Sequence, residues 1–187
     1  MRLVTYSLGI SLDGYAMGPD GSFDWGAPDP EVFALATDEV RGVGVHLMGR
    51  RLYETMLYWQ DPGQHGELDA AEQEFADLWN ALPKVVFSST LTEVDGSARL
   101  ATAGIAEEVA RLREEPDERD IAIGGADLAA QVADLGLIDE YRIRVFPVLV
   151  GGGTPFFAHH GARVDLELLE SRPVGPTVAY LRYRVVR

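Results

Sequence analysis

The chain has 187 residues, of which 47% are hydrophobic and 25% are charged, enough apolar content for one globular domain spanning residues 1–187. The 30 Asp and Glu residues against 16 Lys and Arg give a net charge of −14, which argues against nucleic acid or an acidic membrane surface as a partner. The absence of cysteine excludes disulfides, thiolate catalysis and sulfur-ligated zinc.

The amino-terminal residues lead directly into a strand-like run, without the apolar segment and cleavage site of a secretion signal. Nowhere do about 18 apolar residues follow one another, the length that a membrane-spanning helix needs. We therefore expect a cytoplasmic protein that does not bind membranes.

Strand-like and helix-like segments alternate from the start of the chain to about residue 135. Each short apolar run is followed by apolar residues at helical spacing, a pattern typical of a largely parallel sheet covered on both faces. We expect strands at 3–12, 46–48, 84–87 and 120–123, and helices whose apolar stripes begin at Val32, Leu52, Phe75, Ile105 and Leu128.

The last 50 or so residues follow a different pattern, because apolar and polar residues alternate with a period of two. Tyr141, Ile143 and Val145 alternate with arginines, and a turn cluster at 173–176 precedes a final alternating strand that starts near Leu181. The sequence therefore predicts an α/β fold with a mixed sheet, in which parallel βα units are followed by a C-terminal antiparallel hairpin.

Four of the expected strand ends carry glycine, a polar residue or a charge: 13–14, 49–51, 88–89 and 124–125. In open α/β sheets ligands bind at the carboxyl ends of the strands, so these positions predict one cleft. Glycines that open a helix let its first N–H groups bind an anion, and a neighbouring arginine adds charge. This combination favours a nucleotide site.

Each of these positions also has a purely structural interpretation, which the sequence leaves open. Gly49 can simply make a turn, and the double glycine can let a helix pack close to a strand. Ser88 can cap the turn that follows it, and Asp13 can bond its own backbone before Gly14.

Five segments stand in an order that matches a known superfamily: SLDGYA at 11–16, MGRRLYE at 48–54, VFSS at 86–89, IGGADL at 123–128 and FPVLVGGG at 146–153. Together they resemble the dihydrofolate-reductase-like superfamily, and most of all the C-terminal reductase domain of the bifunctional riboflavin-biosynthesis deaminase-reductases. The resemblance implies a three-layer α/β sandwich. It also implies that the chain is a stand-alone reductase domain, because the deaminase half needs cysteines.

The resemblance further implies that NADPH lies across the strand ends, with NADH as the alternative. Phosphates would meet Gly49, Arg50 and Arg51, and the adenosine side would meet Ser88 and Ser89. The implied contacts to the pyrophosphate, ribose and nicotinamide are Gly124, Gly125, Ala126, Leu128, Ile10 and Ala16.

On the substrate side, the resemblance makes Asp13 the first candidate for substrate contact or proton handling. Trp25, Phe33 and Tyr53 are the other expected substrate contacts, since aromatic rings stack on planar heterocycles. The substrate's own phosphate would need a cation, for which Arg163 or Arg172 is expected.

Three positions depart from the superfamily pattern. The slot of the proton-donating acid of dihydrofolate reductases falls near Phe33, although Asp29, Glu31 or Asp38 could approach it after a shift of alignment. Leu52 replaces a threonine near the phosphates, and Asp127 stands where an arginine can hold the NADPH phosphate, which would weaken NADPH or favour NADH.

The leading hypothesis is an NAD(P)H-dependent reductase of a small heterocycle, most like 5-amino-6-(5-phosphoribosylamino)uracil reductase. The alternatives are a nucleotide-binding or regulatory module without turnover, and a dihydrofolate reductase. No metal site is expected, because the adjacent His159 and His160 lack an acidic partner at ligand spacing. The terminal hairpin leaves an edge strand to cover, so we expect a homodimer.

Overall fold

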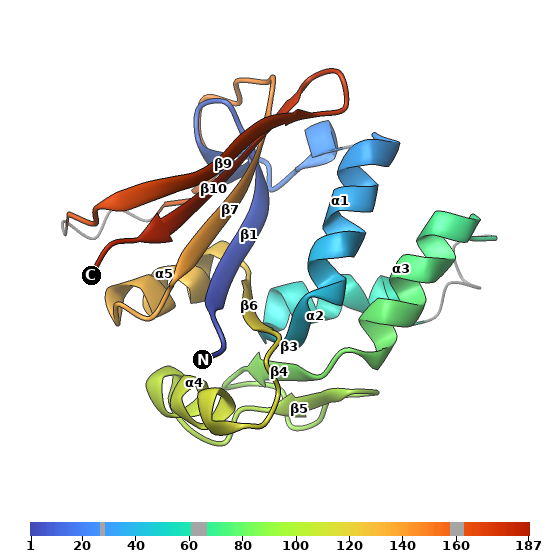
Figure 1. The fold of residues 1–187 in the computed structure, drawn as a ribbon. Helices are drawn as coiled ribbons and strands as arrows, with labels where there is room; N and C mark the ends of the chain where they lie inside the picture. The colour runs from blue at the N-terminus through green and yellow to red at the C-terminus, as the bar shows by residue number, and fades with distance from the viewer. Residues whose placement is uncertain (27–28, 61–66, 158–162) are drawn as a thin grey trace.

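The structure is a computed structural model that describes residues 1–26, 29–60, 67–157 and 163–187 (Figure 1). Its strands are β1 (Val4–Ser11), β2 (Tyr15–Met17), β3 (Val43–Gly49), β4 (Lys84–Phe87), β5 (Ala98–Leu100), β6 (Asp120–Gly124), β7 (Glu140–Phe146), β8 (Thr154–Pro155), β9 (Leu166–Val174) and β10 (Val178–Val185). Its helices are α1 (Pro30–Arg41), α2 (Arg50–Met56), α3 (Ala70–Ala81), α4 (Ile105–Glu114) and α5 (Ala126–Asp134), with short 3-10 turns η1 (Asp24–Gly26) and η2 (Leu57–Trp59).

The main sheet has eight strands in the order β5-β4-β3-β6-β1-β7-β10-β9. Its first six strands pair in parallel, and β10 and β9 then pair antiparallel. The predicted mixed sheet with a C-terminal hairpin is therefore confirmed. Because the six parallel strands point the same way, their carboxyl ends meet at one edge of the sheet, which we call the carboxyl edge.

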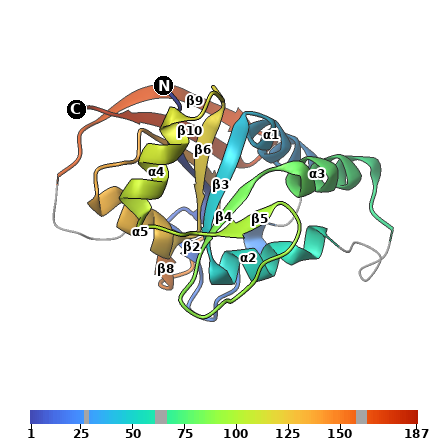
Figure 2. The ribbon, with the colours of Figure 1, turned by 90° about the horizontal axis from the view of Figure 1, so that it is seen from below.

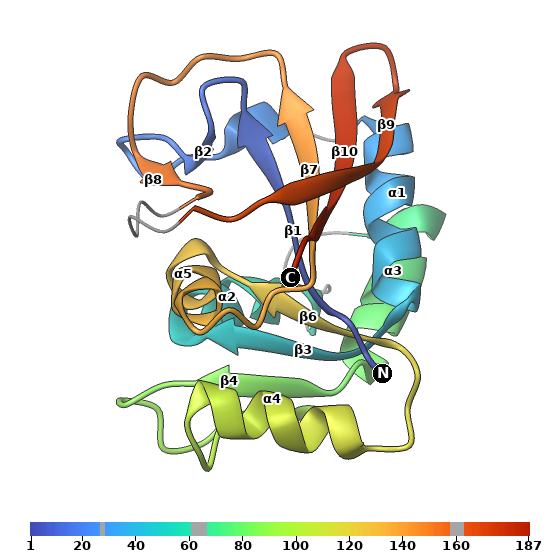
Figure 3. The same ribbon diagram turned by 60° about the vertical axis from the view of Figure 1, so that its left-hand side comes forward.

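Helices cover both faces of the sheet, as Figures 1 and 3 show. Alternating residues of β6 demonstrate the two faces: Ile121 and Ile123 pack with α4 and α5, whereas Ala122 packs with α2 and α3. A third cluster joins the start of α1 to the ends of β7, β9 and β10. The expected three-layer sandwich is thus present. Among the described residues, no helix has the length and apolar character needed to cross a membrane.

Local chemistry explains where the helices begin. Asp29 caps α1 by accepting hydrogen bonds from the N–H groups of Glu31 and Val32, and Pro30 occupies the first helical position. Asp69 and Glu72 form a reciprocal capping box at the start of α3.

The turn expected at 173–176 begins later than the sequence predicts, because β9 continues to Val174 and pairs Pro173 with Ala179. Proline is tolerated there since β9 is an edge strand. Gly175, with φ of 58°, then makes the turn.

Candidate functional site

The structure brings three of the four polar strand ends together at the carboxyl edge, and the fourth, after β1, lies further along because β1 extends past the end of β6. In the parallel register, Met48 pairs with Gly124 and Gly49 pairs with Phe87, so the phosphate-type segments after β3, β4 and β6 are neighbours. Figure 2 shows α2 and α5 starting beyond the ends of these strands. These three strand ends are therefore neighbours, and a single cleft along them stays a prediction.

The double glycine at the end of β6 serves two different purposes. A Cβ on Gly124 would lie 2.3 Å from Cε1 of His46 and 2.4 Å from Cδ2 of Leu52, so this glycine allows close packing. Gly125 has φ of 88° and only Leu52 Cβ, at 4.0 Å, near its missing side chain. The packing interpretation holds for Gly124, and Gly125 makes the turn into α5.

The start of α5 carries no side-chain cap, because Gly125 is the residue that precedes it. The first N–H groups of the helix, at Ala126 and after it, therefore have no side-chain cap among the described residues. Asp127, in the same turn, is exposed to solvent. Such an end can bind an anion, although the Asp127 carboxylate opposes it.

Two arginines follow Gly49 at the start of α2. Arg50 pairs with Glu54 at 3.1 Å on the same helix, and both are exposed. Arg51 is also exposed and makes no ion pair with any described residue. Arg51 is therefore the guanidinium on α2 that is available to a ligand at this edge.

The serines after β4 divide their roles. The Ser88 hydroxyl accepts hydrogen bonds from the N–H groups of Thr90 at 3.1 Å and Leu91 at 3.0 Å. Ser88 thus caps the turn, which is the structural interpretation of this segment. Ser89 is exposed beside it.

The Asp13 carboxylate holds a distant loop. It accepts hydrogen bonds from the N–H groups of Val150 at 3.2 Å and Gly151 at 2.8 Å. A hydrogen bond with the Ser11 hydroxyl, and then those two N–H groups, lower the pKa of Asp13. The exposed carboxylate is therefore ionised at neutral pH, which makes it a poor proton donor.

Further contacts join the two segments that Asp13 connects. The β2 and β8 strands pair antiparallel, and the Leu12 N–H donates to the Val148 carbonyl at 2.8 Å (Figure 3). Gly153 packs so closely on β2 that a Cβ would lie 2.1 Å from the Met17 carbonyl oxygen. We call this paired unit, residues 12–19 with 147–156, the loop clasp.

Three of the expected cofactor contacts are buried. Ile10 and Leu128 are 6% and 5% exposed and belong to the same core cluster, and Ala16 is 6% exposed. Their side chains are held by packing, so a contact with a bound cofactor stays a prediction.

The expected substrate aromatics separate into two groups. Phe33 packs from α1 onto α3, with its ring centroid 5.5 Å from that of Phe75. Tyr53 is 5% exposed, and its hydroxyl accepts a hydrogen bond from the Asp95 N–H at 2.8 Å. Both are held by core contacts, which gives no support to a substrate contact. Trp25 instead lines an open cavity.

This cavity, which we call the tryptophan cavity, lies against the loop clasp and has a volume of about 440 Å³. Its walls come from the segment after β2 and from the loop after β7. Apolar and acidic groups share these walls, which are Gly18, Pro19, Asp20, Ser22, Asp24, Trp25, Val148 and Val150.

The acids of α1 do not replace the missing proton donor near Phe33. Asp29 is occupied as the helix cap, Glu31 is exposed, and Asp38 pairs with Arg41. None of the three lines the tryptophan cavity.

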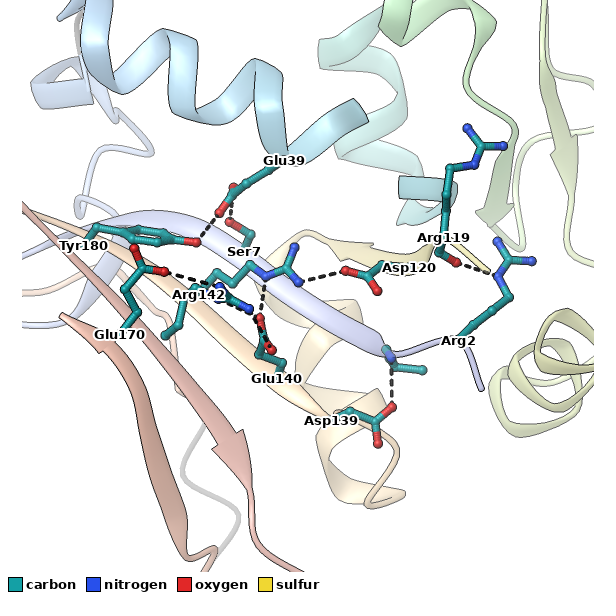
Figure 4. A network of polar contacts seen from close by, with 12 residues as sticks. Arg2, Ser7, Glu39, Arg119, Asp120, Asp139, Glu140, Arg142, Glu170 and Tyr180 are labelled. Atoms are coloured by element: carbon teal, nitrogen blue, oxygen red, sulfur yellow. Dashed lines mark hydrogen bonds and ion pairs between the residues drawn. The ribbon is translucent and has the colours of Figure 1, made fainter. Parts of the chain in front are cut away.

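Glu39 is the acid of α1 that faces the sheet, and the sequence analysis does not identify it. Its carboxylate accepts hydrogen bonds from Ser7 at 2.7 Å and Tyr180 at 2.9 Å (Figure 4). It also accepts one from Arg144 at 2.7 Å. The burial of Tyr180, and then the charge of Glu39, raise the pKa of the Tyr180 hydroxyl. Glu39 therefore anchors α1 on β1, β7 and β10, and its helical spacing from Val32 was the available signal.

The arginines expected to hold a substrate phosphate are both paired. Arg163 bonds Asp165 at 2.8 Å, and Arg172 bonds Glu170 at 2.7 Å on β9. Among the described residues, no group of three or more His, Asp or Glu side chains could hold a metal ion. His159 and His160 lie outside the described residues.

Comparisons with known proteins agree with this arrangement. YyaP of Bacillus subtilis (strain 168), an uncharacterised protein, is 31% identical over 97% of this chain and 94% of its own. A candidate riboflavin biosynthesis protein from Shewanella sp. PV-4 has a TM-score of 0.76 at 22% identity, with 100% of both chains covered. Dihydrofolate reductase from Enterococcus faecalis, in complex with NADP(H), has a TM-score of 0.62 at 14% identity, covering 98% of this chain and 96% of the other.

The two solved structures establish the dihydrofolate-reductase-like fold. The sequence profile of the RibD C-terminal domain matches residues 2–180, which is nearly the whole chain. Because of this match and the 31% identity with YyaP, the chain belongs to the RibD C-terminal domain family.

Proposed function

We propose that this protein is an NAD(P)H-dependent reductase that transfers hydride to a small heterocyclic substrate. The observation that carries the proposal is the uncapped start of α5, which lies at the same sheet edge as the free Arg51. Family membership supports a reductase of the riboflavin-pathway type.

The chain's own groups fit a nicotinamide dinucleotide. The first N–H groups of α5, after Gly125, and the Arg51 guanidinium would hold its phosphates. Gly49 would also border the phosphates, Ser89 would lie along the adenosine side, and Trp25 would face the substrate. When bound, the cofactor supplies a hydride from nicotinamide C4, which carries two electrons to the carbon of a C=N or C=O bond and leaves NAD(P)⁺.

The proton that completes this reduction goes to the substrate nitrogen or oxygen and comes from solvent. Asp13 is ionised and both of its carboxylate oxygens accept backbone N–H groups, so it has no proton to give. We propose that Asp13 is a positioning residue, which holds the loop clasp beside the reacting groups.

Cofactor preference depends on the balance between two charges at the carboxyl edge. Arg51 favours the additional phosphate of NADPH, whereas the exposed Asp127 carboxylate opposes it. We propose NADPH as the cofactor, and predict that Asp127→Asn increases its advantage over NADH by about threefold.

A second candidate is a nucleotide-binding or regulatory module without turnover, which the occupied Ser88 hydroxyl and the half-buried Phe33, packed on α3, favour. Dihydrofolate is a third candidate substrate, but Phe33 stands where its proton donor is expected and Asp29, Glu31 and Asp38 lie elsewhere.

We further propose a homodimer that forms through the terminal hairpin. On the edge strand β9, Leu166 and Leu168 are 38% and 54% exposed, so a free sheet edge coincides with exposed apolar side chains. Light scattering at micromolar concentration is expected to give a dimer, and Leu168→Asp is expected to give a monomer. A monomeric wild-type protein contradicts this assignment.

One screen tests the proposed function. Thermal unfolding is measured with NADPH, NADH, FAD and FMN, and reductase assays then follow the absorbance of the reduced nicotinamide. A shift with NADPH that falls in Arg51→Gln but persists in the exposed control Arg184→Gln is expected. No shift with NADPH or NADH at millimolar concentration contradicts both the reductase and the binding module, and a shift without any turnover favours the module.

A further inference from the structure

We infer that the tryptophan cavity takes an unphosphorylated planar heterocycle, and that phosphorylated substrates are disfavoured there. This inference rests on the proposed reductase function, because it identifies the class of molecule that the enzyme reduces. It departs from the phosphoribosyl substrate that the family resemblance implies.

The shape and position of the cavity suit a single ring system. Trp25, Val148 and Val150 supply the apolar part of its lining, around a volume of about 440 Å³. Asp13 accepts a hydrogen bond from the N–H of Val150, so the clasp fixes that part of the lining. A lining that combines an indole ring with two valines favours a flat, weakly polar ligand.

The charges around the cavity all have one sign. Residues 10–26 and 146–157, which contain the lining residues, include Asp13, Asp20 and Asp24 but no Lys, Arg or His. The Asp20 carboxylate accepts the Ser22 N–H at 2.9 Å, and Asp24 has no ion pair with any described residue. A phosphate dianion would therefore approach two uncompensated carboxylates.

No cation that the sequence offers for a substrate phosphate is free to reverse this sign. Arg163 and Arg172 are committed to Asp165 and Glu170, at 2.8 Å and 2.7 Å. The net charge of −14 adds a general repulsion of anions. The free Arg51 lies on α2, and it belongs to the proposed cofactor side of the edge.

Exposed apolar side chains on the same two segments support an uncharged ligand. Leu12, Phe23 and Leu149 are 64%, 58% and 70% exposed. Large apolar groups left in solvent near a cavity are typical of surfaces that contact a ligand.

The test compares two compounds that differ only by a phosphate, uridine and uridine 5′-monophosphate. Binding is followed by the quenching of tryptophan fluorescence in the wild-type protein and in Trp25→Phe. The part of the quenching that Trp25→Phe loses reports on this cavity, because Trp59 and Trp79 are present in both proteins. At low salt we expect uridine to bind at least fivefold more tightly than its monophosphate. The difference should fall below twofold in the double variant Asp20→Asn/Asp24→Asn and at high salt.

The matched control is Asp77→Asn/Glu107→Gln, which removes the same charge from exposed positions on α3 and α4 and should leave the difference unchanged. Equal or tighter binding of the monophosphate overturns the inference, as does an absence of Trp25-dependent quenching by uridine. Thermal shifts with NADPH on the same preparations separate the two proposals. No shift contradicts the reductase, whereas a shift together with a preference for the monophosphate contradicts only the substrate class.

Discussion

The two edges of the parallel sheet differ in how far their polar groups are hydrogen-bonded or ion-paired within the chain. At the amino-terminal edge, a cavity of about 260 Å³ is lined by Lys84, Arg99, Glu115, Asp117 and Arg119, and these charges are already paired within the chain. Arg99 bonds Glu108 at 2.7 Å, and Arg119 bonds Asp117 at 2.8 Å. At the carboxyl edge, the first N–H groups of α5 and the Arg51 guanidinium have no such partners among the described residues.

Arg2 belongs to the amino-terminal edge, although its Nη2 is buried without a hydrogen-bond partner among the described residues. It is 2% exposed and donates to the Arg119 carbonyl at 2.8 Å, which ties the first residues to the start of β6 (Figure 4). The comparison teaches that a cavity lined by charges is not by itself a binding site. Groups whose hydrogen bonds are complete stabilise the fold, and groups left incomplete are available to a ligand.

The largest expected effect comes from opening the closed edge with Lys84→Met. The buried Lys84 ammonium donates to the carbonyls of Trp79 and Leu82 and to the Ser97 hydroxyl, and all three acceptors would lose their partner. We expect a loss of about 3 kcal/mol in the free energy of unfolding, measured with urea. Arg119→Met, an exposed change at the same edge, should cost less than about 0.5 kcal/mol. Equal losses of stability in the two variants would show that the buried hydrogen bonds of Lys84 do not stabilise this edge.

A pH effect follows from His46, which lies beneath Gly124. Burial, and then the charge of Lys84, lower the pKa of His46 from 6.5 to about 4. Because the folded state binds this proton less readily than the unfolded state, stability falls as the pH drops from about 6.5 towards 4. The contribution is on the order of 2–3 kcal/mol. Urea unfolding at several pH values should show a smaller decline in His46→Gln, and parallel curves for the two proteins would contradict the assignment.

Close packing at the carboxyl edge is tested by Gly124→Ala. The new methyl group would collide with His46 and Leu52, so we expect a loss of about 2 kcal/mol in stability. Adding Leu52→Ala should restore part of it. Gly104→Ala, where the methyl group meets open space, is the control. A neutral Gly124→Ala would mean that this glycine serves the ligand instead of the core.

The smallest expected effect concerns Asp13→Asn. The amide keeps one acceptor for the loop clasp, so stability should change by less than about 1 kcal/mol. We expect kcat/KM to fall about threefold to tenfold while the pH profile keeps its shape, because Asp13 positions the clasp and donates no proton. A changed pH profile of kcat/KM would show that Asp13 takes part in proton transfer.

Long apolar patterns predicted most of the fold, whereas contacts between distant segments did not follow from the sequence. The strands β2, β5 and β8 have three, three and two residues, too short for a period of two to be recognised. The residue types at the carboxyl edge were likewise predictable, because the alternation of strands and helices places Gly49 and Gly124 at the same edge of a parallel sheet.

Individual side-chain roles needed the structure. Asp13 meets a loop 137 residues away, and the sequence suggested only its own turn or a substrate. Glu39 was missed because its partners come from three separate strands. The packing role of Gly124 depends on His46 and Leu52, which no local pattern connects with it.

The most direct test of the contrast between the edges is amide hydrogen exchange with and without NADPH. The account predicts slower exchange at 49–52 and 124–128 when NADPH is present, and no change at the amino-terminal edge around 82–85 and 115–119. Protection confined to the amino-terminal edge, or no protection at saturating NADPH, would contradict the central claim that the carboxyl edge is the binding side.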